Sequence, residues 1–338
     1  MPSTFLVMFL LLTGVQAVAR AEVSNADIQS TWRPFSIDSP WNKTLSDDSA
    51  IDPRSAKLIA DFASRGPLYI NIKEWSIPVY YVESSQTPMH DVGDLRPGIY
   101  GEGFAPPRAV PIPDGATASL PAGGDEHLAV VDIDRGLEWG MWQARLVDGQ
   151  WVTGLGAMTD LTGDGVAKPW FQAEPESESH RARASGFPLI AGLIRLNEIK
   201  AGHIPHALVF AYDFVQTEHF VPPASTAQAS TNTTRNNKDG MPMGAHIRLN
   251  PDFDIDASAL SPVGKTIARA LQEYGAFLGD FAGGNVLYAE SSPEALKAWD
   301  GLLDSRELEE VFTPEMIKRH FQLLDMGAVQ KGQNFSPP

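Results

Sequence analysis

Histidine and positive charge are concentrated between His180 and Arg248 in a chain whose formal net charge is −16. Five of the eight histidines lie there, with seven arginines and lysines against four carboxylates. Cationic side chains near histidines suit a site that holds an anionic group and moves a proton near neutral pH. The alternative is that these residues are scattered over loops and a sheet surface without a common function.

The chemistry that best fits this composition is β-elimination from a uronate. That reaction removes the proton next to a carboxylate, so it needs a cation to neutralise the carboxylate and a side chain to accept the proton. We therefore predict a secreted polysaccharide lyase acting on a uronate-containing glycan. The candidate carboxylate binders are Arg248 and Arg195, the candidate bases His206 and His127, the candidate acid Tyr274, and a further substrate-binding residue His203.

His206 and His127 are favoured as bases because of their places in the chain. His206 follows Pro205, which rules out a regular helix there, and precedes an apolar run typical of a buried strand. His127 begins a second strand after a glycine-rich turn, so it is expected at the rim of a sheet. A structural histidine bonded to a backbone carbonyl remains the alternative for His206, and a solvated histidine for His127.

Two other functions remain open. Glu138 and Asp280 could be the carboxylate pair of a glycoside hydrolase that acts on a neutral glycan. The alternating strand from Leu137 places Glu138 and Trp142 on one face and Trp139 on the other. This strand resembles the nucleophile strand of sandwich-type glycoside hydrolases, with tryptophans for sugar stacking. Without converging titratable groups, the chain would be a non-catalytic glycan-binding envelope protein.

A calcium ion is the one cofactor that the sequence suggests, and none is required by the predicted reactions. Asp160 and Asp164 begin a segment that resembles the start of an EF-hand loop. Thr162 and Phe171 stand where further ligands belong, so a complete EF-hand is excluded. A partial calcium loop or a simple Asp-Gly turn remains.

Composition excludes several other classes of protein. The chain has no cysteine, which removes disulfides, thiolate nucleophiles and cysteine-based metal sites. It has neither the G-x-S-x-G nor the H-E-x-x-H motif. Its acidity argues against binding to nucleic acid or to an anionic membrane surface.

The first 21 residues have the pattern of a secretory signal peptide. An apolar stretch from Phe5 to about Val18 is followed by Ala19-Arg20-Ala21, a small-residue cleavage signature. We expect cleavage near Ala21 and a secreted or periplasmic protein of bacterial origin. Residues 22–290 are then predicted to form one β domain, and residues 291–338 a helical extension.

The elements that would position these residues are mainly short strands. Six segments have strand-forming composition, and Asp148-Gly149 predicts a type I′ hairpin turn. Helices are expected after Asp52-Pro53, Ser261-Pro262 and Thr313-Pro314, with a shorter one around residues 295–303. We expect a β-sandwich or jelly roll with a few peripheral helices. The long polar loop 222–244 is either a lid or disordered.

Parts of the chain resemble secreted bacterial all-β proteins. The likeness rests on residues 184–195, 202–208 and 274–280, and would extend from about Trp41 to Tyr288. The resemblance implies export and a single domain, and it implies no particular chemistry.

Overall fold

The computed structural model describes residues 32–96, 103–172, 182–227 and 237–332. Strands outnumber helices there and form several sheets, one of them curled like half a barrel, so the predicted mainly β fold is confirmed. The predicted signal peptide lies outside the described residues, as do residues 228–236 of the long loop. In the described ranges, no helix is long and apolar enough to cross a membrane.

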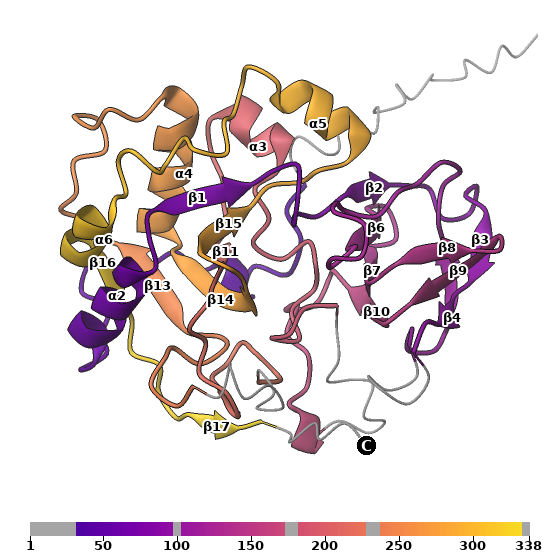
Figure 1. The fold of residues 1–338 in the computed structure, drawn as a ribbon, viewed down its shortest axis with the longest axis horizontal. Coiled ribbons are helices and arrows are strands. Elements are labelled where there is room, and N and C mark those ends of the chain that lie inside the picture. Colours follow the sequence, from indigo (N-terminus) through magenta and orange to yellow (C-terminus); the bar gives the residue numbers. More distant parts are fainter. Residues whose placement is uncertain (1–31, 97–102, 173–181, 228–236, 333–338) are drawn as a thin grey trace, which may run out of the picture.

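Two lobes lie side by side in Figure 1, and the larger one is built on a six-stranded mixed sheet. Its order is β1-β15-β11-β14-β13-β16, with parallel pairing between β1 and β15 and between β11 and β14. The strands are β1 (Leu68–Asn71), β11 (Leu208–Tyr212), β13 (His246–Leu249), β14 (Ala276–Phe281), β15 (Asn285–Tyr288) and β16 (Phe321–Leu323). A separate pair is formed by β12 (His219–Phe220) and β17 (Gln330–Lys331).

All five α-helices of the described residues belong to the larger lobe (Figure 1). They are α2 (Ser55–Ser64), α3 (Leu196–Ala201), α4 (Pro262–Glu273), α5 (Pro293–Trp299) and α6 (Pro314–His320); two 3-10 turns are η1 (Pro40–Asn42) and η2 (Trp170–Gln172). The expected starts of α4 and α6 are confirmed, because Ser261 and Thr313 cap them and proline follows. The last of these helices ends at His320, because the chain straightens into β16 and pairs with β13.

The smaller lobe consists of β-sheets alone. Its main sheet has the order β10-β7-β6-β2, and two small sheets pair β3 with β5 and β4 with β9 and β8. The strands are β2 (Val79–Tyr81), β3 (Met89–Asp91), β4 (Gly93–Asp94), β5 (Ala109–Pro111), β6 (Leu128–Asp132), β7 (Leu137–Trp142), β8 (Arg145–Val147), β9 (Gln150–Thr153) and β10 (Leu155–Asp160). The Asp148-Gly149 turn is confirmed, with positive φ at both residues.

The sheet of the smaller lobe is buried on both faces. Trp139 and Met141 of β7 pack into a small core that is confined to this lobe. Ala129 and Val131 of neighbouring β6 face the large core, which continues into the other lobe. The predicted alternation of faces along these strands is therefore confirmed, and one face of the sheet meets the larger lobe.

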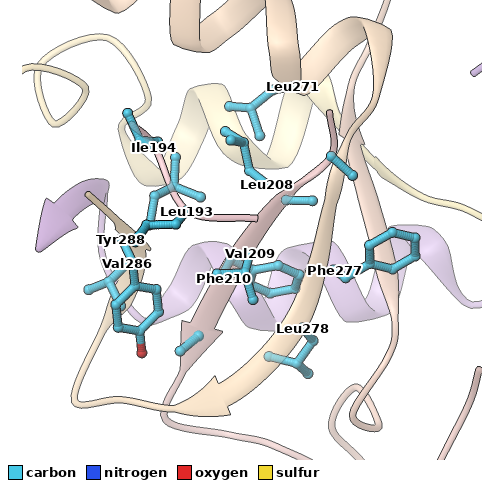
Figure 2. Packing of buried hydrophobic residues seen from close by; sticks show 14 of the residues in the cluster. Leu193, Ile194, Leu208, Val209, Phe210, Leu271, Phe277, Leu278, Val286 and Tyr288 are labelled. Carbon is cyan, nitrogen blue, oxygen red and sulfur yellow. The ribbon is translucent and has the colours of Figure 1, made fainter. Parts of the chain in front are cut away.

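A linker segment, residues 182–195, runs between the two lobes and covers one face of the six-stranded sheet. Phe187 packs edge-on against Trp41 at 4.8 Å and approaches Gly279, where a Cβ would lie 3.1 Å from its ring. Gly192 (φ +67°) touches the backbone of β11 so closely that any side chain there would clash. Figure 2 shows Leu193 and Ile194 of the linker packed with the sheet residues Leu208 and Tyr288.

The predicted sandwich or jelly roll is not confirmed. Jelly rolls are double sheets of antiparallel strands, whereas the large sheet here is mixed and carries helices. The C-terminal segment predicted as a helical extension also contributes β16 to the edge of that sheet.

Candidate functional site

The face of the smaller lobe's sheet that meets the larger lobe carries three of the predicted site residues. Extending the register of β6 and β7 by one step puts His127 opposite Trp142. Glu138 lies on the same face, where its Oε1 accepts a hydrogen bond from the Ile190 N–H at 3.0 Å. A Cβ on the intervening Gly140 would lie 3.5 Å from Glu138 Oε1 and 3.6 Å from Ala182 Cβ. The linker therefore lies directly over this face.

Arg183 of the linker is a buried cation whose charge acts on His127. It is 1% exposed, and its guanidinium lies 4.6 Å from the centre of the Tyr288 ring. Its Nη1 is 3.8 Å from Asp280 Oδ2, beyond hydrogen-bond distance, and its Nη2 is 3.5 Å from the Leu189 carbonyl oxygen. Nε and Nη1 have no hydrogen-bond partner among the described residues. A buried guanidinium with unused donors favours an anion at this position.

His127 is a neutral histidine beside this arginine. It is 2% exposed, and its ring lies beside the Ala182 backbone, which opposes the lowering of its pKa, although neither ring nitrogen makes a hydrogen bond of good geometry in the described ranges. Burial lowers the pKa of His127 to about 4; Asp125 opposes the shift and the positive charge of Arg183 adds to it. At neutral pH the imidazole is uncharged, so one nitrogen is free to accept a proton.

Tyr288 and two aspartates complete the surroundings of Arg183. Burial raises the pKa of Tyr288 well above its usual value, and Asp280 acts in the same direction, so its hydroxyl stays protonated. Figure 2 shows that this hydroxyl points away from the aliphatic side chains of the core. Asp125 accepts a hydrogen bond from Trp142 Nε1 at 3.2 Å. We call the group of Arg183, His127, Tyr288, Asp280 and Asp125 the Arg183 site.

A second group of buried ionisable residues surrounds Arg195, and we call it the Arg195 network. Arg195 pairs with Glu198 through a short contact and also donates to the Trp32 carbonyl oxygen. Glu198 in turn lies 3.0 Å from His206 Nε2. Although burial alone would raise the pKa of Glu198, Arg195 and His206 lower it to about 2. The predicted residues Arg195 and His206 are thus brought together, and both side chains face a carboxylate of the protein itself.

Two further groups belong to the Arg195 network. Glu290 accepts a hydrogen bond from the Leu196 N–H at 2.8 Å, and burial raises its pKa to about 7. Tyr81 of β2 has a buried hydroxyl that interacts electrostatically with Arg195. The network therefore also lies between the lobes, but its arginine has a carboxylate in direct contact.

The remaining predicted site residues lie elsewhere. Arg248 donates to Gln322 Oε1 at 2.9 Å and to the carbonyl oxygens of Ser46 and Asp47, which ties the segment before α2 to the sheet. Tyr274 ends α4, and its carbonyl oxygen is 2.8 Å from His246 Nε2. His203 is exposed and faces Glu273 at 3.4 Å.

The proposed sugar-stacking and calcium-binding residues are also placed by the structure. Trp139 is buried in the small core, whereas Trp142 is half-buried beside Asp125. Asp160 Oδ1 accepts hydrogen bonds from the N–H and hydroxyl of Thr162, and Asp164 Oδ1 accepts one from the Val166 N–H. These are hydrogen bonds within turns. In the described part of the chain no group of three potential metal ligands is found.

Sequence reasoning did not single out Arg183, Tyr288 or Asp125 as site residues. Arg183 was counted in the positive segment, but its sequence neighbours carry no motif. Tyr288 lies at the end of β15, which was not predicted, so nothing pointed to its position. The available signal was the alternation within each strand, which placed His127 and Glu138 on a defined face of their own strands, whereas the pairing of β6 with β7 that brings them together was not predicted.

Comparisons with known proteins add no relative. No model of a protein family matches the chain. Neither the curated proteins nor the solved structures contain a significant match. The Arg183 site itself is therefore the feature that points to a function.

Proposed function

We propose that the protein is a secreted lyase that cleaves a uronate-containing polysaccharide at the Arg183 site. The observation that supports this most directly is the buried Arg183 guanidinium, whose Nη1 is 3.8 Å from Asp280 Oδ2 and whose Nε and Nη1 have no hydrogen-bond partner among the described residues. Nε and Nη1 of Arg195 also lack partners, but Glu198 contacts that arginine directly. A substrate carboxylate would supply both missing acceptors and a negative charge. Arg248 and Arg195 were the sequence-based candidates for this role, but both are already engaged with protein acceptors.

The proposed reaction uses the neighbours of Arg183 for proton transfer. Arg183 neutralises the uronate carboxylate, which makes the adjacent C5–H more acidic. The neutral imidazole of His127 accepts that proton, and the C–H electron pair forms a double bond between C4 and C5. The bond from C4 to the glycosidic oxygen breaks, and the protonated Tyr288 hydroxyl donates a proton to the leaving oxygen. The products are an unsaturated uronate and a chain with a new hydroxyl end.

A panel of polyuronates tests this proposal. Cleavage is followed both by the ultraviolet absorbance of the unsaturated product and by new reducing ends. Arg183→Met should reduce kcat/KM by roughly 10²–10³-fold, because the developing charge loses its cation. Arg183→Lys keeps the charge but not the planar fork, and should lose less activity.

Arg248→Met is the matched control for the loss of a buried arginine. It should lower stability while leaving the turnover of each folded molecule unchanged. Full activity of a folded Arg183→Met variant would contradict the proposal.

A hydrolase is the second candidate, because Glu138 and Asp280 both lie near Arg183. A carboxylate pair separated by about 5–10 Å can hydrolyse a neutral glycan through acid and base or nucleophile roles. New reducing ends without unsaturated product, lost together in Glu138→Gln and Asp280→Asn, would favour this reaction. Binding of a glycan without any cleavage would instead indicate a glycan-binding envelope protein.

A further inference from the structure

Trp75 is an exposed tryptophan held in a backbone conformation that large residues rarely adopt. It lies in the loop between β1 and β2, its φ is +55°, and 43% of it is exposed. Such a conformation costs free energy and persists where surrounding contacts enforce it, often at functional positions. An exposed indole in a strained conformation is therefore a feature that folding alone does not explain.

The contacts of Trp75 fix its position on both sides. Its N–H donates to the Leu120 carbonyl oxygen at 2.7 Å, and its own carbonyl oxygen accepts from Asn71 Nδ2 at 3.1 Å. Its ring lies on Gly124, where a Cβ would come within 2.9 Å of Cζ3. The backbone of Trp75 is thus held by two hydrogen bonds, and its indole lies against Gly124, which leaves room for the ring.

This surface is close to the Arg183 site. Gly124 immediately precedes Asp125, which belongs to that site. Trp75 Cζ3 is 2.9 Å from the position of a Cβ on Gly124, and the Cα of Asp125 is one residue further along the chain. The ring therefore lies within roughly 8 Å of the Asp125 Cα. Ser119, next to Leu120, also exchanges two hydrogen bonds with the backbone of His127.

We propose that Trp75 is a carbohydrate-stacking platform, on which the apolar face of a sugar ring rests while a neighbouring uronate occupies the Arg183 site. This inference rests on the proposed function, because it takes the glycan as the ligand. The exposed apolar surface here consists of Trp75 and Leu120 (54% exposed), with charged Lys73 and Glu74 beside it. It is too small for a protein interface, which buries roughly 800 Å² per partner. It is large enough for one ring.

Binding of uronate oligosaccharides of increasing length tests the platform. Titration calorimetry on the His127→Gln variant avoids turnover, and wild-type protein replaces this variant if no cleavage is found. Trp75→Ala should weaken the binding of oligosaccharides roughly tenfold and leave the binding of a single uronate unchanged, while Trp75→Phe should have a smaller effect. Gly124→Ala should also weaken binding, because it displaces the ring.

Leu146→Ala is the matched control, since Leu146 is 59% exposed and lies on the hairpin of β8 and β9. It should leave binding unchanged. Equal affinity of wild type and Trp75→Ala for every length would overturn the platform, even if Arg183-dependent cleavage is found. Trp75-dependent glycan binding without Arg183-dependent cleavage would support the platform while rejecting the lyase. Absence of any glycan binding would overturn both.

Discussion

Arg183 and Arg195 lie on one linker and are equally buried, but they differ in what neutralises them. Arg195 contacts Glu198 directly, and Glu198 is shared with His206. Asp280 Oδ2 lies 3.8 Å from Arg183 Nη1, and the neighbouring His127 is uncharged at neutral pH. Burial of a charge is costly unless it is paired and hydrogen-bonded. The Arg195 network meets that requirement within the protein, whereas an anionic ligand would complete the Arg183 site.

Histidine and arginine content alone therefore does not locate a site. Both groups lie between the lobes and both contain residues of the positively charged segment. Nε and Nη1 lack a hydrogen-bond partner among the described residues in both arginines, so the two are distinguished by the carboxylate that contacts Arg195 and not Arg183. Loss of Arg195 should therefore lower stability, whereas loss of Arg183 should lower activity.

The largest expected effect on stability is the loss of one partner of the Arg195 network. Arg195→Met or Glu198→Gln should each destabilise the protein by about 3–5 kcal/mol, because the remaining partner is left as an uncompensated buried charge. Chemical denaturation measures this. The exposed pair of Arg306 and Glu309 (2.7 Å) is the control, and Arg306→Met should leave the denaturation midpoint nearly unchanged because solvent screens this pair. Equal effects at both pairs would contradict the distinction.

Glu290 should make stability depend on pH in the Arg195 network. Its pKa is raised from 4.5 to about 7 on folding, so its protonated form is favoured in the folded state. This contribution is fully present below about pH 4.5 and is lost as the pH rises through about 7. The loss should reach about 3 kcal/mol.

Glu290→Gln keeps the acceptor for the Leu196 N–H and should remove this pH dependence. Denaturation midpoints measured across this pH range would show it. The exposed Glu294→Gln is the control and should behave as wild type. If the denaturation midpoint changed with pH in the same way for wild type and Glu290→Gln, the proposed buried protonated carboxyl would be contradicted.

His206 should affect stability more than turnover. Its Nδ1 lies 2.9 Å from the Ala207 carbonyl oxygen and its Nε2 faces Glu198. His206→Ala should therefore cost about 1–3 kcal/mol by leaving buried acceptors unpaired. Activity of the folded fraction should be retained. His203→Ala, at the exposed histidine of the same short segment, should change little. Loss of turnover in folded His206→Ala would return His206 to the list of catalytic candidates.

Arg183→Met should have the smallest effect on stability. The substitution removes a weakly paired buried charge and replaces it with an apolar side chain of similar length, so the free energy of unfolding should change by less than about 1 kcal/mol. The same variant should lose uronate binding, which titration calorimetry detects. Destabilisation as large as that of Arg195→Met would show that Arg183, like Arg195, is a structural residue.

Local features of the fold were predictable because they depend on neighbouring residues. Ser261-Pro262 and Thr313-Pro314 mark helix starts through capping and a preset φ, and Asp148-Gly149 accepts the positive φ values of its turn. The alternation within β7 correctly placed Glu138 and Trp142 on one face, but only the pairing with β6 brings His127 to the same face. The strands β14 and β15 were not predicted. Their short apolar segments flank Gly283-Gly284, and such a segment does not by itself reveal which strand it pairs with.

The sequence by itself determined the candidate residue types, the boundaries of several elements and the mainly β composition, since these follow from local backbone preferences and side-chain periodicity. Only the tertiary structure decided which arginine has a carboxylate in contact. Arg183 meets Asp280 and Tyr288 because β14 and β15 lie under the linker, and Arg195 meets Glu198 because α3 begins directly after it. The three-residue spacing of Arg195 and Glu198 could have suggested their pairing. The contacts of Arg183 with distant strands depend on packing that no short motif specifies.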